Sequence, residues 1–499
     1  MSKKSLGEQR DQRIRNLAAL QERGFEPYPY EFTPTAYAED LHARFPEPEA
    51  GETYAEGEQF VVAGRIMLLR NLGKLTFATL QDTTGRIQVS FEKDDLPGYN
   101  ALKKIDLGDW IETTGTLYAT RTGELTVRVS EFRPLVKSLR PLPDKHHGLV
   151  QKESRYRQRH LDLIVNPEVR KAFEYRAKAI SFIRRTLDDL GFIEVETPVL
   201  QAIPGGADAR PFTTHHNALD YDFYLRISLE LYLKRLIIGG FDQVYEIGRN
   251  FRNEGISYKH NPEYTMLELY WVGKDYIDIL ELVEQLYSEL VKKITGSYVL
   301  TYQGQELDFT APWPRVDYTG ELAKRAGMDF DPMDEEKLRA WTAEHHPEHE
   351  PSEEGPLAER ALNQIYDKLY DIYVEPHLVG PVFVMDHPLV ISPLSKPHRD
   401  RPGLVERFEP VAVGMELGNA FSELNDPIDQ RARFEAQQAL RDQGDDEAQM
   451  FDEEFLEALE YGMPPTGGLG LGIDRLAMLL ADVPSIRDVI LFPLLRPQG

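Results

Sequence analysis

Residues 251–272 (FRNEGISYKHNPEYTMLELYWV) combine charged and apolar side chains in a way that is typical of a binding site for a charged ligand. Their ionisable members include Arg252, Glu254, His260, Glu263 and Glu268. The aromatic and aliphatic neighbours suggest burial, yet charged side chains are rarely buried without a partner, because leaving water is unfavourable for a charge. We therefore expect that these groups pair with one another or that a charged ligand completes the site.

A second candidate region is the glycine-rich stretch TGGLGLGIDRLAMLL, which precedes a predicted helix opening at Asp474. Its glycines are Gly467, Gly468, Gly470 and Gly472. Glycine backbone ahead of a helix allows a phosphate to approach closely, although a tight packing turn is at least as good an interpretation. No βαβ unit follows, which argues against a dinucleotide-binding loop. Arg475, at the helix start, is the sharper candidate for binding an anion.

The segment RFEPVAVGMELGNAFSELND contributes carboxylates and an amide at short spacing. Its polar members include Glu409, Glu416, Asn419, Glu423 and Asp426. Gly414 allows a turn between Glu409 and Glu416, and two carboxylates brought together either repel each other or share cations. Ligands that are all oxygen, beside phosphate, favour Mg²⁺ over zinc. Taken alone, this segment favours the alternative of two surface glutamates on a β-hairpin.

The pattern of apolar residues predicts the elements that position these groups. Residues 243–272 are expected to form two strands around the polar loop EGISYKHNPEY. Alternation gives the second strand an apolar face of Thr265, Leu267, Leu269 and Trp271. The other face carries Met266, Glu268 and Tyr270. Arg252 and Glu254 are expected to project to this same side from the first strand, so one surface of the hairpin is charged.

Residues 166–191 have the spacing of an amphipathic helix, with Asn166 as cap, Pro167 in the first helical position and Gly191 at the stop. Its apolar positions are Val169, Phe173, Ala177, Ile180, Ile183, Leu187 and Leu190. The helix leads into FIEVETPVL, a predicted strand that ends at Pro198.

Three further stretches are assigned from composition and periodicity. Residues 273–294 and 426–461 are expected to be helical, whereas the acidic residues 330–360, rich in His and Pro, are expected to form a solvated loop. A metal site in that loop would have to use His345, His346 and His349. Their spacing is not distinctive, so the loop interpretation is favoured.

Residues 60–138 read as five short strands with a helical stretch after the third, which is the order of an OB-fold barrel. Alternation predicts inward-facing side chains at Ala78, Leu80, Ile87, Val89 and Phe91. The outward-facing set is Phe77, Thr79, Gln81, Arg86, Gln88 and Ser90. An exposed Phe77 beside Gln88 is suited to stack on a nucleic-acid base, although single surface aromatics are common.

The composition limits the class of protein. The chain has 499 residues, which suggests two to four domains, and 41% of them are hydrophobic. Cysteine is absent, which excludes disulfides, thiolate zinc sites and a cysteine nucleophile. No apolar run approaches the roughly 18 residues of a membrane span, and the charged start has no apolar secretory region. We therefore expect a cytoplasmic protein without membrane association.

The net charge of −26 argues against indiscriminate nucleic-acid binding but leaves room for a local basic surface. Residues 133–160 hold eight Arg and Lys against two acidic residues. They are expected to form either such a surface or a solvated linker. The prolines and glycine of RPLPDKHHG indicate a linker within them.

Together these segments resemble a known family. GFIEVETPVL, FRNEGISYKHNPEYTMLELYW and GLGLGIDRLAML are similar to motifs 1, 2 and 3 of the class II aminoacyl-tRNA synthetases. The barrel and the segments LPDKHHGL, RYRQRHLDLI, IPGGADARPF, RISLELYLKRL and NAFSELNDP resemble the lysyl-tRNA synthetases of subclass IIb. The resemblance spans nearly the whole chain, except about residues 330–360.

The resemblance implies an α+β protein with two domains. Residues 1–148 would hold an OB-fold anticodon-binding barrel, with its core at about 60–138, and a linker. Residues 149–499 would form a class II catalytic domain, an antiparallel six-stranded sheet flanked by helices. The helix and strand that end at Pro198 would form the interface of a homodimer. The implied reaction joins lysine and ATP to give lysyl-adenylate and pyrophosphate, with Mg²⁺, and then transfers the lysyl group to the 3′ end of tRNA(Lys).

The resemblance also implies roles for individual residues. As catalytic residues, Arg252 would contact the α-phosphate and the substrate carboxylate, and Arg475 the γ-phosphate. The implied ATP contacts are Arg252, Glu254, His260, Asn261, Tyr264 and Arg475, with Tyr264 stacked on adenine. The implied lysine contacts are Gly206, Glu230, Arg252, Glu268, Tyr270, Asn419, Phe421 and Glu423. Glu409 and Glu416 would bind Mg²⁺. The implied anticodon contacts are Arg65, Phe77, Gln88 and Glu124. One departure is Ala420, where the family leads us to expect glycine.

Three alternatives stay open. An aspartyl or asparaginyl enzyme of the same subclass is disfavoured, because an aspartate pocket needs a cationic residue where this one is acidic. A relative that lysylates a protein instead of tRNA would lack the OB domain. A non-catalytic tRNA-binding protein would be favoured by loss of either motif arginine, but Arg252 and Arg475 are both present.

Overall fold

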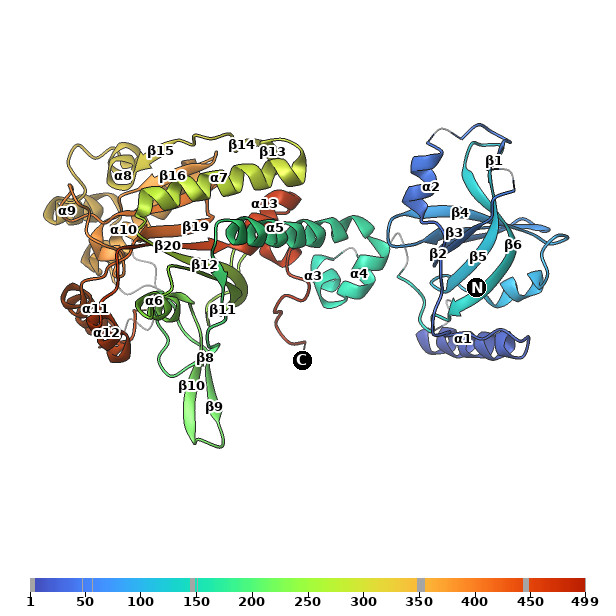
Figure 1. Ribbon diagram of the computed structural model, residues 1–499, viewed down its shortest axis with the longest axis horizontal. Helices are drawn as coiled ribbons and strands as arrows, with labels where there is room; N and C mark the ends of the chain where they lie inside the picture. Colours follow the sequence, from blue (N-terminus) through green and yellow to red (C-terminus); the bar gives the residue numbers. More distant parts are fainter. Residues whose placement is uncertain are drawn as a thin grey trace. The chain divides into compact units, whose positions relative to one another are not determined.

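The computed structural model describes residues 5–46, 48–55, 57–143, 149, 151–347, 355–442 and 448–498. The chain divides into two compact units, Met1–Val150 and Gln151–Gly499, and each has its own hydrophobic core (Figure 1). Most of the LPDKHHGL segment lies outside the described residues, as does His349.

A five-stranded barrel forms the centre of the N-terminal unit. Its strands are β2 (Phe60–Asn71), β3 (Leu75–Gln81), β4 (Arg86–Glu92), β5 (Trp110–Ala119) and β6 (Leu125–Val136). Antiparallel pairs run in the order β5-β2-β3-β4, and β6 closes the barrel by pairing with β4 in parallel and with β5 antiparallel. The helical stretch after the third strand is a 3-10 helix, Tyr99–Lys104. The predicted OB-fold is therefore confirmed.

The barrel interior follows the predicted alternation. The predicted inward-facing side chains are all buried, namely Ala78, Leu80, Ile87, Val89 and Phe91. On the outer face the prediction is less accurate, because Phe77 is half-buried rather than exposed. Ser90 and Gln81 are buried there too, since Tyr118 donates a 3.1 Å hydrogen bond to Ser90 and Arg86 donates to Gln81. The barrel's own side chains thus partly cover its outer face.

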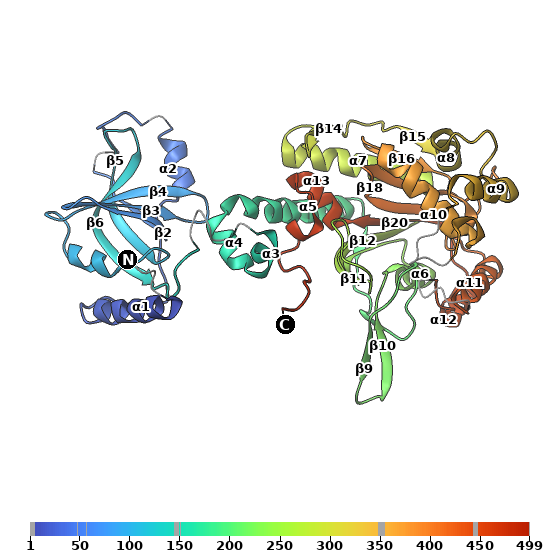
Figure 2. The same cartoon turned by 180° about the vertical axis from the view of Figure 1, so that it is seen from behind.

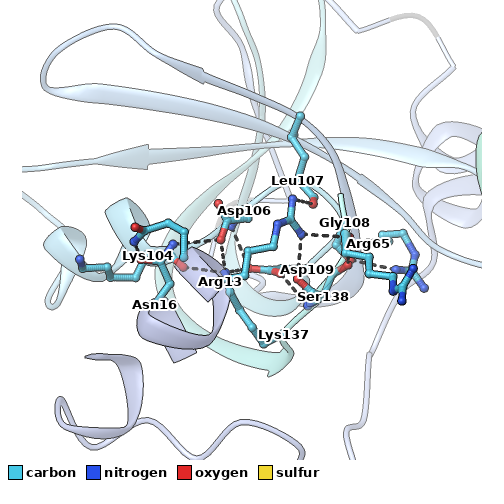
Figure 3. A network of polar contacts seen from close by, with 12 residues as sticks. Arg13, Asn16, Arg65, Lys104, Asp106, Leu107, Gly108, Asp109, Lys137 and Ser138 are labelled. Carbon is cyan, nitrogen blue, oxygen red and sulfur yellow. Dashed lines mark hydrogen bonds and ion pairs between the residues drawn. The ribbon is translucent and has the colours of Figure 1, made fainter. Parts of the chain in front are cut away.

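A buried ionic network attaches the helix α1 (Leu6–Gln21) to the barrel (Figure 3). Lys137 is almost inaccessible, and its Nζ lies 2.5 Å from Asp106 Oδ2 and 2.6 Å from Asp109 Oδ2. Arg13 of α1 donates to three backbone carbonyls, those of Leu107, Ser138 and Arg140. Because the charges of this network have partners, it holds α1 in a fixed position on the barrel.

The basic stretch at residues 133–160 is not a single exposed surface. Besides Lys137, Arg159 is buried, and its guanidinium lies 2.8 Å from Asp162. Arg155 pairs with the other oxygen of the same carboxylate at 2.7 Å. The expectation of a local basic surface or a solvated linker is wrong for these three residues, because the protein neutralises their charges internally.

One large sheet organises the C-terminal unit. Six central strands are antiparallel neighbours, in the order β16 (Val382–Met385), β17 (Arg407–Ala412), β19 (Gly418–Ser422), β20 (Thr466–Gly472), β12 (Glu263–Val272) and β11 (Gln243–Phe251). Short strands add in parallel at the two edges, namely β15 (Arg315–Asp317) and β7 (Ile193–Glu194). A further short strand, β18 (Met415–Glu416), pairs with β17. The predicted antiparallel six-stranded sheet is confirmed.

Helices cover both faces of this sheet (Figures 1 and 2). One face packs against α5 (Arg170–Asp189), α7 (Tyr276–Thr295) and α13 (Ile473–Ala481). The other face packs against α6 (Glu230–Ile238), with α11 (Pro427–Asp442) and α12 (Glu453–Glu460) beyond it. The predicted helices at 273–294 and 426–461 are confirmed, the second as two helices.

The predicted helix at 166–191 is present with different details. A 3-10 turn, Pro167–Val169, precedes α5, and Asn166 makes no side-chain cap. The buried positions of α5 are Ala172, Ala179, Ile183 and Leu187. Ala177 and Leu190, predicted as apolar packing positions, are exposed. The following strand ends at Glu194 rather than Pro198, since only two residues pair with β11.

The expectation of a loop at residues 330–360 is wrong for α9 (Glu335–His345). The side chain of Asp334 caps this helix, and Leu338 and Thr342 are buried. His345 stacks on Trp341 with ring centroids 4.1 Å apart. These apolar and aromatic contacts stabilise a helix that the acidic composition did not indicate.

The remaining elements complete the two units. They are α2 (Ala38–Arg44), β1 (Thr53–Tyr54), α3 (Lys152–Arg157), α4 (Arg159–Val165), β8 (Leu200–Gln201), β9 (Thr213–His216), β10 (Tyr221–Leu225), β13 (Val299–Tyr302), β14 (Gln305–Asp308), α8 (Tyr318–Ala326) and α10 (Leu362–Tyr373). The β9–β10 hairpin projects away from the large sheet in both views. Throughout the described ranges, every helix is too short or too polar to cross a membrane.

Candidate active site

Three central strands of the sheet form the floor of a cavity of about 560 Å³. The side chains that β12 and β19 contribute to its lining are Met266, Glu268, Tyr270, Asn419 and Phe421. Between them, β20 presents Gly468 and Gly470, each of which pairs with one of these residues on both sides. Glycines in the middle strand hollow the face of the sheet, so the side chains of the flanking strands converge over them.

The glycines of β20 are needed for close packing. A Cβ at Gly468 would lie 1.8 Å from Glu423 Oε1 and 2.9 Å from a ring carbon of Tyr270. The stretch is a strand in the middle of the sheet, and α13 begins directly after it at Ile473. The stretch is therefore not a turn. The close packing at Gly468 agrees with the tight-packing interpretation, and Gly472, at the end of the strand, lines a cavity together with Arg475.

Two buried carboxylates at one end of the cavity share an internal lysine. Glu230, at the start of α6, and Glu423, directly after β19, both line the cavity. Lys234 lies one turn further along α6, with its Nζ 2.5 Å from Glu230 Oε1 and in direct contact with Glu423 Oε2. Burial alone would lower the pKa of Lys234, but the two carboxylates outweigh it and raise the pKa. The protein thus supplies one cation of its own to acids that were expected to depend on a ligand.

Glu268 is a third buried carboxylate in the same cavity. It accepts hydrogen bonds from Ser228 Oγ at 3.1 Å, from the Leu229 amide at 3.0 Å and from the Tyr270 hydroxyl at 3.4 Å. Burial raises the pKa of Glu268 to about 7, and the carboxylate of Glu230 adds to the effect. Entry of a cation would favour the charged form, so this group is set to release a proton when a cation binds.

Gly206 brings the backbone close to these acids. Its φ of +87° lies in the left-handed region, and a Cβ there would be 2.9 Å from both the Cβ of Glu230 and the Oγ of Ser228. Only glycine satisfies both requirements, so the backbone forms this part of the cavity wall.

Arg252 is the first residue of the loop between β11 and β12, since β11 ends at Phe251. The expectation that Arg252 and Glu254 belong to the strand is therefore wrong, although Arg252 does line the cavity. Its guanidinium carbon lies 5.4 Å from the ring centroid of Tyr264, which is a cation–π contact. Among the described residues its Nε has no hydrogen-bond partner. A desolvated guanidinium with an unused donor is suited to bind an anion.

A second cavity, of about 200 Å³, adjoins the first. Its walls include every residue that the family resemblance implies for ATP: Arg252, Glu254, His260, Asn261, Tyr264 and Arg475. The first cavity includes every residue implied for lysine: Gly206, Glu230, Arg252, Glu268, Tyr270, Asn419, Phe421 and Glu423. Arg252 belongs to both walls, so it lies where the two cavities meet.

Arg475 is oriented by two neighbours. Its Nη1 donates to the Glu416 carbonyl at 2.6 Å and lies 3.2 Å from the Glu416 carboxylate. Its Nη2 lies 3.3 Å from His260 Nε2. Because a guanidinium only donates, Nε2 must accept, so Nδ1 of His260 carries the proton and donates to Ser257 Oγ at 2.9 Å. Burial and then the charge of Arg475 lower the pKa of His260 to about 4, which keeps the ring neutral at pH 7.

The two glutamates of the β17–β18 hairpin face the same side. Glu416 pairs with Val411, and Glu409 lies two residues before Val411 on its strand. The connecting turn uses Gly414 with a φ of +64°. Both carboxylates line the first cavity, so the predicted turn does bring them together.

Each of these two carboxylates pairs with its own arginine: Glu409 with Arg407, and Glu416 with Arg475. Burial would raise the pKa of Glu409, but Arg407, 2.6 Å away, and His387 outweigh it and lower the pKa to about 2. Burial and the charge of Glu409 raise the pKa of Glu416. Within the described ranges, no group of three or more His, Asp or Glu side chains could hold a metal ion by itself. A metal ion bound here would need further oxygen ligands from a substrate.

The candidate anticodon residues lie on the outer face of the barrel. Phe77 pairs with Ser90, and Gln88, two residues earlier on the same face of β4, donates to Thr126 at 2.9 Å. Arg65 lies further along this face, where its guanidinium is 5.5 Å from the ring centroid of Trp110. Glu124 is exposed in the turn before β6. The structure thus brings Phe77 and Gln88 together but spreads the four residues across the face.

Comparison with known proteins agrees with this geometry. Residues 151–496 match the family of class II tRNA synthetases (D, K and N), and residues 60–135 match the OB-fold nucleic acid binding domain. A protein from Deinococcus radiodurans named lysine–tRNA ligase is 55% identical, over 99% of this chain and 95% of its own length. The chain belongs to the lysine–tRNA ligase family. Lysine–tRNA ligases from Moorella thermoacetica and Thermotoga maritima are 51% and 48% identical, over 97% and 99% of this chain and 97% of their own lengths.

Two charged residues of this site, Lys234 and Arg407, are not among the residues expected from the sequence. Lys234 follows Glu230 by four residues on a helix, and Arg407 precedes Glu409 by two on a strand, so each pair lies on one face. Both spacings were readable from the sequence. Ala420, the one departure from the family pattern, is buried on the opposite face of β19, away from the cavity.

Proposed function

We propose that the chain activates lysine with ATP and transfers the lysyl group to the 3′ end of tRNA(Lys). The observation that carries the proposal is the pair of adjoining cavities with Arg252 at their junction. The larger is acidic at one end and suits an amino acid with a cationic side chain. The smaller is bordered by two arginines and suits a nucleoside triphosphate.

In the first proposed step, the lysine carboxylate attacks the α-phosphate of ATP and pyrophosphate leaves. Attack brings two anions together, so positive charge at the junction lowers the barrier, and Arg252 supplies that charge. Arg475, oriented by Glu416 and His260, would bind the distal phosphate. The attacking carboxylate is already ionised, so this step needs no general base. In the second step, a hydroxyl of the 3′-terminal nucleotide attacks the acyl carbon and AMP leaves.

Lysine selection is proposed to depend on the three buried carboxylates. Glu268 and Glu423, with the Tyr270 hydroxyl, would bind the side-chain ammonium group. Glu230 and the backbone at Gly206 would bind the α-ammonium group. Binding the two ammonium groups to separate carboxylates at the acidic end of the cavity would orient the substrate carboxylate toward Arg252, which is the geometry that adenylate formation requires.

Mg²⁺ is proposed as the cofactor, held by Glu409 and Glu416. The donor set fits, because both groups are carboxylates on one face of a hairpin and line the same cavity. Mg²⁺ prefers oxygen ligands and commonly completes its shell with substrate phosphates. When bound, it would neutralise charge on the phosphates of ATP.

The barrel is proposed to read the anticodon with Phe77 as a stacking platform, since unpaired bases are recognised by stacking and edge contacts. A homodimer is proposed from apolar side chains exposed on and near α5, β7 and β8, namely Leu190, Ile193, Val199 and Leu200. Light scattering of a Leu200→Asp variant would test it by a shift to monomers. A cytoplasmic location is also proposed, because the cysteine-free composition needs no oxidising compartment.

Pyrophosphate exchange, run separately with each standard amino acid, tests the proposed activation step. Lysine should support exchange far above the others, because only its side chain carries a flexible ammonium group. Exchange that depends on aspartate or asparagine would contradict the proposal and favour another member of the subclass. The Arg252→Ala variant serves as the control for exchange by contaminating enzymes.

A further inference from the structure

Lys234 is a buried cation that the proposed reaction does not use. Its side chain has no solvent exposure and is absent from the cavity wall, whereas both its carboxylate partners, Glu230 and Glu423, line the cavity. Its ammonium nitrogen lies 5.6 Å from the ring centroid of Phe421, which covers it on another side. Lys234 thus lies behind the wall, where it holds the two acids without reaching the substrate.

The charges at this end of the cavity balance only when Lys234 is counted. When a bound cation favours their charged forms, Glu230, Glu268 and Glu423 carry three negative charges, and Lys234 neutralises one of them. A bound lysine brings two ammonium groups, while its carboxylate is matched by Arg252. The two carboxylate charges that Lys234 does not neutralise are therefore matched by the two ammonium groups of lysine. No buried charge is then left without a partner.

Two ionisable groups beside the acids, Arg407 and Tyr270, do not change this balance. Arg407 is engaged by Glu409 at 2.6 Å and by Asn419 at 2.9 Å. Tyr270 lies in the floor, and its hydroxyl donates to Glu268, so it contributes no charge. Stability alone does not explain the cluster either, because packed apolar residues of similar volume stabilise a core as well as buried ion pairs do.

We propose that Lys234 is a positioning residue that sets the charge of the substrate pocket at minus two and so matches it to an amino acid with two ammonium groups. The inference rests on the proposed function. Lys234 acts through its partners: it holds Glu423 by Oε2 and leaves Oε1 over Gly468, while Glu423 lines the cavity.

Discrimination between lysine and norleucine tests the proposal, because norleucine has the same chain length but only one ammonium group. The readout is the ratio of kcat/KM values in pyrophosphate exchange. Glu423→Gln leaves one negative charge, so it should lower the ratio of lysine to norleucine at least about tenfold. Adding Lys234→Met restores two negative charges and should raise the ratio again at least about fivefold.

The single variant Lys234→Met leaves three carboxylates for two ammonium groups. Its lysine KM should rise at least about tenfold, while its ATP KM changes less than about twofold. Lys137→Met is the matched control, because Lys137 is also buried between two carboxylates but belongs to the other unit. Its lysine KM should equal that of the unaltered protein.

Three outcomes would overturn or redirect the inference. An unchanged lysine KM in folded Lys234→Met would overturn it. So would a double variant that discriminates no better than Glu423→Gln, and this comparison remains valid even if Lys234→Met alone does not fold. Absence of lysine-dependent exchange in the unaltered protein would instead contradict the proposed function.

Discussion

At the residue scale, Glu268 links lysine binding to pH. Burial raises the pKa of Glu268 to about 7, and a bound ammonium group favours its charged form. Below pH 7 most molecules of the free protein are protonated at Glu268, and this proton must leave when lysine binds. Lysine affinity should therefore rise with pH, by up to about tenfold per unit below 7, and level off above it.

Calorimetry in two buffers of different ionisation enthalpy measures this proton release directly. Glu268→Gln should reduce the proton release, because no proton is exchanged at that position, while Glu230 and Glu423, whose pKa values burial also raises, remain. A lysine affinity that is constant between pH 6 and 8 in the unaltered protein would contradict the assignment.

Arg252 gives a second prediction at this scale. Arg252→Ala should lower adenylate formation at least about 100-fold, because a contact to the developing charge on the α-phosphate is removed. Single-turnover formation of lysyl-adenylate measures the step. Arg249, which pairs at 3.6 Å with Glu263 and lines neither cavity, offers a matched control. Near-normal rates in a folded Arg252→Ala variant would show that another group stabilises the transition state.

Individual residues differ in how far the sequence could predict their positions. Alternation along β12 predicts the cavity-facing side of Glu268, whereas the position of Arg252 at a cavity was expected from its motif and not from its predicted strand. Lys234 and Arg407 were missed, since each looks like an ordinary charged residue until its carboxylate partner is known. Burial of a charge depends on what packs over it, and Lys234 is covered by a distant segment that carries Phe421 and Glu423.

At the scale of elements, β20 decides the shape of the site. Gly468→Ala should raise the lysine KM at least about tenfold, because a Cβ there would lie 1.8 Å from Glu423 Oε1 and must displace it. Gly470→Ala should have a smaller effect, since its nearest neighbour is the flexible end of Met266 at 3.1 Å. Steady-state exchange kinetics for both variants give the comparison. Equal effects of the two substitutions would contradict this account of the floor.

Elements with a strict alternation were predicted well, and elements defined by packing were not. Apolar and polar residues alternate along the barrel strands and the β11–β12 hairpin, and the structure contains these strands. The strand after α5 stops at Glu194, because pairing with β11 ends there and not because the sequence changes character. The helix α9 was missed since its composition is acidic, although only Leu338 and Thr342 need to be buried.

At the scale of the whole molecule, the barrel and the catalytic unit are expected to act in different steps. Phe77→Ala should cost roughly 1–3 kcal/mol of tRNA affinity if anticodon bases stack on it. That corresponds to about five- to 150-fold in aminoacylation efficiency. Lysine-dependent pyrophosphate exchange needs no tRNA and should stay intact.

Two other results would change the interpretation of Phe77. A parallel loss of both activities would mean that this half-buried side chain supports the barrel fold. No loss in either would mean that the outer face of β3 does not bind the anticodon.

Mass analysis of the tRNA product tests the central claim most directly. The full chain is incubated with lysine, ATP, Mg²⁺ and a tRNA transcript that carries a lysine anticodon. The 3′-terminal nucleotide is then released, and its mass is measured by mass spectrometry. We expect a lysyl ester on that terminal nucleotide, formed only with lysine, and lost in Arg252→Ala. A terminal nucleotide that carries another amino acid, or that stays unmodified while lysine becomes attached to protein, would contradict it.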